Sequence, residues 1–287
     1  MILVTGATGE LGGLVVGNLL KTVSASEIAV LVRDEAKAAG LKAQGVQIRV
    51  GSYTDTDSLA TALQGIDKVL LVSSNDFNDR FGQHKNVIDA AKNAGVKHIF
   101  YTGVTMQGIE TSALNPLLAS HYETEDYIKA SGLTYTLLQN SLYFEVIPMF
   151  VGANVLETGV YFPAGEGKVA FATRADLAEV AAITLTSEGH ENKVYDLAGS
   201  TAYSFADVAA ELSAIAGKDV AYISPEPADF EGLLKQFGLP EGIIFMSLAF
   251  AAGIKNNEFD LPSTTLETLL GRKSTDLSAF IKATYGA

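Results

Sequence analysis

The first half of the chain alternates short apolar runs with helical patterns, and this alternation constrains the fold more than any other feature. The runs are rich in β-branched residues and apolar throughout, so they indicate strands that are buried on both faces. The predicted strands are Ile2–Val4, Glu27–Val32, Gln47–Val50, Lys68–Val72, His98–Tyr101 and Thr134–Leu138. The predicted helices between them are Leu11–Thr22, Glu35–Ala43, a segment ending at Gly65, Gln83–Asn93 and His121–Ala130. This repeat predicts an α/β fold of the Rossmann type, with a doubly wound parallel sheet.

The helix that ends at Gly65 lies in the stretch SYTDTDSLATALQG, where Thr56 or Asp57 is the predicted N-cap. Beyond about residue 140 the alternation loosens. Further elements are predicted at Arg174–Leu185, Lys193–Leu197, Phe205–Ala216, Asp219–Ile223, Pro227–Phe237, Leu239–Gly253 and residues 275–286. We therefore expect residues 1–140 to form the NAD(P)-binding core. Residues 141–287 are expected to form mainly a smaller α/β cap that lines a substrate cleft, with some elements returning to the core.

Three glycines lie at the first strand-to-helix junction, in the stretch VTGATGELGG. In a dinucleotide-binding turn, Gly6 would allow the sharp turn, Gly9 the approach of phosphate to the backbone, and Gly12 the close packing of helix on strand. The helix N-terminus would add N–H groups and partial positive charge. The predicted pyrophosphate site comprises Gly6, Thr8, Gly9, Glu10, Leu11 and Gly12. A purely structural turn is the alternative.

Arg33 follows the second predicted strand, where NAD-selective sites usually carry an acidic residue for the ribose 2′-hydroxyl. A guanidinium can instead bind a 2′-phosphate, so this position favours NADP(H) over NAD(H). Asp34 follows directly and weakens that preference, and a solvated loop arginine is the alternative explanation. The ends of the other strands add cofactor-binding candidates at the same edge, with ordinary loop capping as the competing explanation. These candidates are Ser52, Tyr53, Ser73, Ser74, Asn75, Tyr101, Thr102 and Gly103.

Composition excludes several classes of protein. The net charge of −13 disfavours a nucleic-acid partner. The chain has no cysteine, which excludes disulfides, thiolate zinc sites and cysteine nucleophiles. We expect no membrane span, because no apolar run reaches about 18 residues, and a cytoplasmic location, because the N-terminus lacks a secretory signal. No metal site is expected, because the histidines show no paired spacing, and the absence of a G-x-S-x-G motif argues against a hydrolase.

Five stretches together resemble the NmrA-like group of atypical short-chain dehydrogenases: VTGATGELGG, VLVRDEAKA, AGVKHIFYTG, HYETEDYIKASGLTYTLLQNSLYFE and LLGRKSTDLSAFI. The most specific is His121-x-x-Thr124-Glu125, followed by TLLQNSLY. Within the group the chain is similar to bacterial NADPH:quinone oxidoreductases and triphenylmethane reductases. The resemblance implies NADPH binding through the glycine turn and Arg33. It also implies a substrate site that includes Asn140, Ser141 and Tyr143, whereas Gln139 stands where relatives often carry arginine.

The Tyr-x-x-x-Lys pair of alcohol-oxidising short-chain dehydrogenases is absent, because Tyr122 and Tyr127 are followed four residues later by Asp126 and Ser131. If the helix of those enzymes is laid on this segment, His121 falls where the lysine would be. Hydride transfer to a quinone or an extended cationic dye needs little acid–base assistance, since the acceptor is already electrophilic. The sequence therefore predicts an NADPH-dependent oxidoreductase that acts on quinones or similar flat acceptors.

The catalytic candidates are His121, Asn140 and Tyr143. His121 would donate a proton to the developing quinolate, or would only pack its helix. An aromatic wall for a small flat substrate would comprise Tyr143, Phe144, Phe150 and Phe245, which would otherwise be ordinary core residues. The alternative function is that of an NmrA-type redox sensor, which binds NAD(P) without turnover. Homodimerisation is left open.

Overall fold

The structure is a computed structural model that describes residues 1–286. It divides into two compact units, each built from separate stretches of the chain. Unit 1 comprises Met1–Val104, Ser120–Asn140 and Arg174–Asp196, and unit 2 comprises the remaining described residues. Among the described helices, none has both the length and the apolar character needed to cross a membrane.

Unit 1 contains a seven-stranded sheet. Its strands are β1 (Ile2–Val4), β2 (Ile28–Val32), β3 (Gln47–Val50), β4 (Lys68–Leu71), β5 (His98–Val104), β6 (Thr134–Asn140) and β9 (Lys193–Leu197). They are ordered β3-β2-β1-β4-β5-β6-β9, and neighbours from β3 to β6 pair in parallel. The predicted Rossmann-type α/β fold is confirmed. The order reverses between β1 and β4, and in such sheets ligands bind at the carboxyl ends of the strands beside this point.

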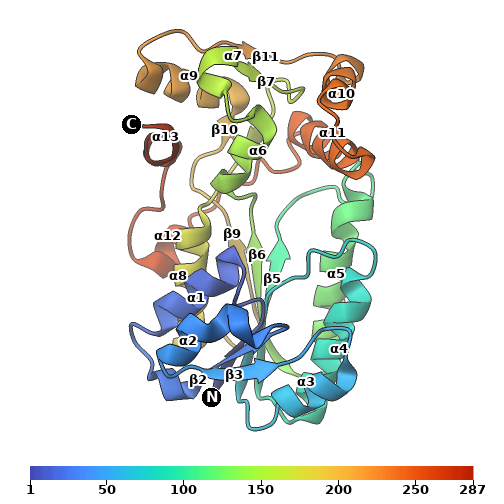
Figure 1. The fold of residues 1–287 in the computed structure, drawn as a ribbon, viewed down its shortest axis with the longest axis vertical. Helices are drawn as coiled ribbons and strands as arrows, with labels where there is room; N and C mark the ends of the chain where they lie inside the picture. The colour runs from blue at the N-terminus through green and yellow to red at the C-terminus, as the bar shows by residue number, and fades with distance from the viewer. Residues whose placement is uncertain (287) are drawn as a thin grey trace. The chain divides into compact units, whose positions relative to one another are not determined.

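Helices cover both faces of the sheet (Figure 1). They are α1 (Glu10–Leu19), α2 (Ala39–Ala43), α3 (Thr56–Ala62), α4 (Arg80–Asn93), α5 (Asn115–Ala130) and α8 (Arg174–Thr186), with short 3-10 turns η1 (Ala25–Glu27) and η2 (Glu35–Ala38). α5 begins six residues before the predicted start at His121, because Pro116 is tolerated in the first helical turn.

The N-cap of α3 is Asp55, so the prediction of Thr56 or Asp57 was wrong. The Asp55 carboxylate accepts hydrogen bonds from the N–H groups of Asp57 and Ser58, at 3.2 and 3.1 Å. Asp55 also has the extended backbone of a cap residue, whereas Thr56 and Asp57 lie inside the helix. Three residues that are able to cap stand in a row in this stretch, and only the path of the chain selects among them.

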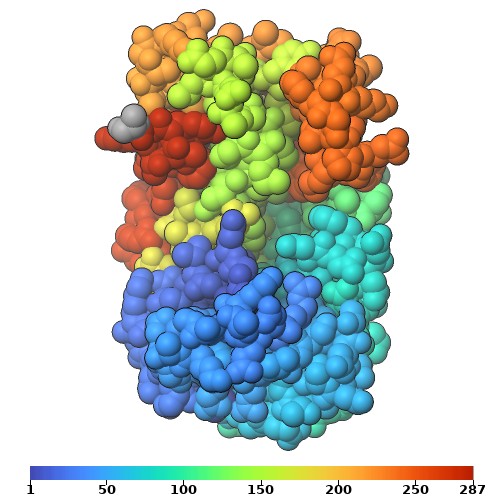
Figure 2. Space-filling model, viewed as in Figure 1, coloured from blue at the N-terminus to red at the C-terminus, as the bar shows by residue number. Residues whose placement is uncertain are grey.

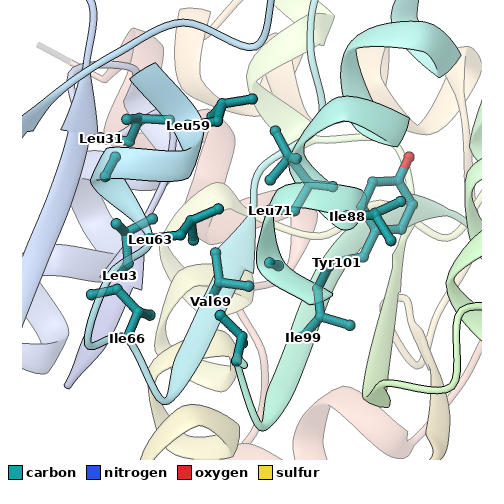
Figure 3. Close-up of a cluster of buried hydrophobic side chains, with 14 of the residues drawn as sticks. Leu3, Leu31, Leu59, Leu63, Ile66, Val69, Leu71, Ile88, Ile99 and Tyr101 are labelled. Carbon is teal, nitrogen blue, oxygen red and sulfur yellow. The ribbon is translucent and has the colours of Figure 1, made fainter. Parts of the chain in front are cut away.

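One face of the sheet packs against α3, α4 and α5 (Figure 3). Leu3, Val69 and Leu71 pack with Leu63 and Ile88 in this cluster, and all are at most 1% exposed. The alternate strand positions, such as Ile28, Val30 and Leu70, are also fully buried. Burial of both sets of side chains explains the continuous apolar runs in the sequence.

Unit 2 contains two small sheets: β8 (Lys168–Val169) pairs antiparallel with β10 (Tyr203–Ser204), and β7 (Val160–Tyr161) pairs in parallel with β11 (Tyr222–Ile223). Its remaining elements are η3 (Phe144–Val146), α6 (Ile147–Val151), α7 (Val155–Thr158), α9 (Phe205–Ala216), α10 (Pro227–Gln236), α11 (Glu241–Lys255), α12 (Thr265–Leu270) and α13 (Leu277–Tyr285). The strand predicted at Asp219–Ile223 is shorter than expected. In Figure 2 side chains of α10 and α11, in orange, form part of the surface of this unit.

Aromatic side chains form much of the core of unit 2. Phe144 stacks on Phe171 and Phe280, with ring centroids 5.3 and 5.2 Å apart. Phe150 stacks on Phe162 at 4.9 Å. Two members of the predicted aromatic wall, Phe144 and Phe150, therefore pack within this unit, whereas the side chain of Phe245 is 48% exposed.

Candidate functional site

The turn between β1 and α1 contains three glycines, two of which, Gly6 and Gly12, could not be replaced without strain or displacement. Gly6 has a φ of +61°, in the left-handed region that favours glycine. A Cβ on Gly12 would lie 2.3 Å from the carbonyl oxygen of Gly6, and a Cβ on Gly9 would lie 3.3 Å from the same oxygen. The N–H of Gly9 donates to that oxygen at 2.9 Å, which closes the turn.

The turn leaves backbone donors for a ligand. Gly9 is the N-cap of α1 and has no side chain to satisfy the first-turn N–H groups. Thr8 and Glu10 are exposed beside them, and Leu11 is buried and anchors the helix to the core. Helix N-termini bind phosphate through such N–H groups and the helix dipole. The residues present therefore fit the pyrophosphate of a dinucleotide.

The next two strand ends place Arg33 and Tyr53 near each other. Arg33 is exposed at the end of β2, and its positive charge acts to lower the pKa of the Tyr53 phenol. Burial nevertheless raises the pKa of Tyr53 above its ordinary value. The Tyr53 hydroxyl donates to the carbonyl of Val72 at 2.8 Å and hydrogen-bonds the Thr5 hydroxyl, so it ties β1 to β4. Ser52 is half-buried, and its N–H donates to the Ser58 hydroxyl at 3.1 Å.

The loop after β4 is held by α4. The Ser74 N–H donates to Nε2 of His84 at 2.9 Å, and Arg80 Nε donates to the Ser74 carbonyl at 2.8 Å. Because Nε2 accepts, the proton of His84 lies on Nδ1, which donates to the Thr124 hydroxyl at 2.9 Å. Burial and the charge of Arg80 lower the pKa of His84 to about 3, so the ring is neutral. The side chain of Asn75 is exposed at this loop.

The end of β5 joins α5 through Tyr101 and His121. Tyr101 is fully buried, and its hydroxyl oxygen lies 2.8 Å from Nδ1 of His121. Burial, with the nearby charge of Arg80, lowers the pKa of His121 well below its ordinary value. At neutral pH His121 is therefore an uncharged imidazole rather than an imidazolium acid. The neighbouring Thr102 is 2% exposed, and its hydroxyl accepts from the N–H of Ser73 at 2.9 Å.

Glu125 is a buried carboxyl group between β5 and β6. Its Oε2 accepts from Nε2 of Gln139 at 2.7 Å, whereas Oε1 has no hydrogen-bond partner within residues 1–286. Oε1 faces Gly103, where a Cβ would lie only 2.5 Å away. Burial raises the pKa of Glu125 from 4.5 to about 7, although the Gln139 hydrogen bond and the charge of Lys129 lower it.

The predicted site residues divide between the two units. Unit 1 carries the glycine turn, Arg33, the candidates that follow β3, β4 and β5, and both His121 and Asn140. Asn140 is 4% exposed and ends β6. Tyr143 belongs to unit 2, where it forms a bridge with Ala172.

Several polar groups at this edge were not predicted as site residues, although Thr124 and Glu125 belong to the motif that carries the family resemblance. They are Arg80, Gln83, Thr124, Glu125 and Arg174, and each except Arg174 is less than 9% exposed. A buried charged residue is rare without a partner, but partners that are distant in sequence cannot be read from one chain. Within residues 1–286, no three histidine or acidic side chains gather closely enough to hold a metal ion.

The fold and the glycine turn define a dinucleotide-binding protein of the Rossmann class. The profile of the NmrA-like family matches residues 1–282, and the chain belongs to this family. The chain is 45% identical to quinone oxidoreductase 2 of Escherichia coli, over 97% of this chain and 96% of that protein. It is 36% identical to an NAD(P)H azoreductase of Xenophilus azovorans, over 85% of this chain and 83% of that protein.

Two solved structures are similar along nearly the whole chain. The NADPH complex of the NADPH-dependent quinone oxidoreductase of E. coli has a TM-score of 0.93 and 42% identity, with 100% of both chains covered. The NADP(H) complex of the triphenylmethane reductase of Citrobacter has a TM-score of 0.91 and 38% identity, with 99% of both chains covered. The family predicted from the sequence is confirmed.

Proposed function

We propose that this chain is an NADPH-dependent reductase of quinones or similarly flat electrophilic acceptors. The observation that carries the proposal is the β1–α1 turn, where Gly12 excludes any Cβ and α1 presents N–H groups that have no side-chain cap. The relatives support the substrate class, because their names specify a quinone oxidoreductase, an azoreductase and a triphenylmethane reductase.

NADPH would supply the hydride, and the residues of this chain would bind and orient it. The first turn of α1 would hold the pyrophosphate, and Arg33 would bind the 2′-phosphate. Arg33 is exposed at the end of β2, so its guanidinium is accessible to a ligand. We expect Arg33→Ala to weaken NADPH binding by about 10- to 100-fold and NADH binding much less, since a charge-assisted hydrogen bond contributes roughly 1.5–3 kcal/mol. Equal losses for both nucleotides in a titration would remove Arg33 from the 2′-phosphate.

A proton must reach the reduced acceptor, and the pair formed by Tyr101 and His121 is the candidate donor. A neutral His121 whose Nδ1 accepts from the Tyr101 hydroxyl carries its proton on Nε2. We propose that this Nε2–H group passes its proton to the acceptor oxygen while Nδ1 takes the proton of the Tyr101 hydroxyl, so that the imidazole stays neutral and the tyrosinate that remains is reprotonated from solvent. Asn140, at the end of β6, is proposed to position the acceptor through polar contacts.

The test is turnover. NADPH oxidation, followed by absorbance, should begin when a benzoquinone or naphthoquinone is added to the protein. Tight NADPH binding without oxidation, across a panel of quinones, azo dyes and triphenylmethane dyes, would overturn the enzyme assignment. That result would favour a redox sensor, which also binds NAD(P) but needs no acceptor.

A further inference from the structure

Arg174 is the first residue of α8, and it contacts the first residue of α1. Its Nη1 lies 3.1 Å from Oε2 of Glu10. The side chain of Arg174 is 18% exposed, whereas that of Glu10 is 77% exposed. The cation of this pair is therefore held by its surroundings, and the carboxylate can rotate into water.

The contact brings two helix N-termini together within unit 1. α1 and α8 lie side by side (Figure 1). Each N-terminus carries the equivalent of about half a positive charge, and the Arg174 guanidinium adds a full charge beside them. The same first turns carry two carboxylates, those of Glu10 on α1 and Asp176 on α8, so the positive charge is offset while Glu10 stays paired with Arg174. When Glu10 moves away from the guanidinium, the two helix N-termini and Arg174 leave a net positive charge beside the glycine turn, which favours an anion.

We propose that the guanidinium of Arg174 binds the cofactor pyrophosphate, and that Glu10 is the partner which the pyrophosphate replaces. This inference rests on the proposed function, since the ligand is the dinucleotide. A guanidinium forms paired hydrogen bonds to phosphate oxygens as readily as to carboxylate oxygens. Little free energy is lost when Glu10 leaves, because an ion pair whose carboxylate is 77% exposed contributes roughly 0–1 kcal/mol.

The roles of Arg174 and Arg33 then differ in a measurable way. The pyrophosphate is common to NADPH and NADH, so Arg174 contributes to the affinity for both. Arg33 would contribute only where a 2′-phosphate is present. Glu10 has the opposite effect to Arg174, because its negative charge lies beside the same phosphates and occupies the guanidinium.

The experiment measures Kd by calorimetric titration with NADPH and with NADH at low ionic strength. We expect Arg174→Ala to raise both Kd values by about 10- to 100-fold. Glu10→Gln should lower both by roughly two- to fivefold, and the gain should shrink in about 0.5 M salt because the charge is exposed. Lys92→Ala is the matched control: it removes one exposed positive charge at the C-terminal end of α4 and should leave both Kd values unchanged.

Unchanged Kd values in Arg174→Ala, or an effect on NADPH alone, would overturn the assignment. Weaker binding in Glu10→Gln would overturn it as well. That variant changes an exposed side chain, so it tests the inference even if Arg174→Ala does not fold. Wild-type protein that binds neither nucleotide would refute the proposed function itself, whereas wild-type binding that Arg174→Ala leaves intact refutes only the role of Arg174.

Discussion

The buried carboxyl of Glu125 should make the stability of this protein depend on pH in an unusual direction. Its pKa is raised from 4.5 to about 7 by burial, so the folded state binds the proton more tightly than the unfolded state does. The stabilising contribution is therefore complete below about pH 4.5 and is lost as the pH rises through about 7. The difference between the two pKa values corresponds to about 3 kcal/mol.

Glu125→Gln should remove this dependence, because a glutamine stays uncharged and can still accept from Gln139. The unfolding free energy of the variant, minus that of the wild type, should rise by about 3 kcal/mol between about pH 4.5 and about pH 8.5. The charges nearest to Glu125 are those of Lys129, which lowers its pKa, and of Asp126 and Asp196, which raise it. These three charges are the same in both proteins, so their own titration largely cancels in the difference.

Urea denaturation followed by circular dichroism, without nucleotide, measures this difference at a series of pH values. Glu123→Gln is the matched control, because it removes an exposed carboxylate from the same helix and leaves Glu125 in place. Parallel stability curves for wild type and Glu125→Gln would refute the reasoning. They would mean that the carboxylate is ionised in the folded protein near its ordinary pKa.

Two further predictions concern the glycine turn and the imidazole. Gly12→Ala places a Cβ 2.3 Å from a backbone oxygen, so it should destabilise the fold by roughly 1–3 kcal/mol in urea denaturation and weaken NADPH binding in a titration. Gly17→Ala is the control, because a Cβ there would meet no atom within 4 Å. It should be neutral or slightly stabilising in the same denaturation assay. His121→Gln should lower kcat by roughly tenfold and leave the NADPH affinity unchanged. The pH–rate profile of the wild type should show no inflection near the ordinary pKa of histidine, because the His121 ring is already neutral there. An inflection there that His121→Gln abolishes would contradict this.

The fold was predictable because its signals are local. Continuous apolar runs such as Ile28–Val32 indicate strands that are buried on both faces, and the structure buries every residue of that strand. The glycine spacing marks the first turn because the backbone itself needs it: Gly6 has a positive φ, and Gly12 touches the chain six residues earlier. Neither feature depends on a partner elsewhere in the chain.

The polar partners at the sheet edge were not predictable for the opposite reason. Arg174 meets Glu10 only because α8 packs beside α1, and Glu125 meets Gln139 only through the pairing of β5 with β6 and the packing of α5. The pKa of His121 likewise depends on burial and on the charge of Arg80, neither of which can be read from the sequence around a histidine. The prediction of the α3 N-cap was wrong for a more local reason, because three adjacent residues are all able to cap a helix.

The interleaving of the two units constrains how this protein can be made in the cell. α8 and β9 complete unit 1, although Arg174 follows Asn140 only after a stretch that belongs to unit 2. A growing chain that has emerged from the ribosome only as far as Asn140 has an unpaired edge at β6, and α1 lacks the helix that covers it. Such an edge is prone to pair with other chains. Completion of the nucleotide-binding unit must therefore await the synthesis of residues 174–196, and premature termination before them should give an aggregating product rather than a small working domain.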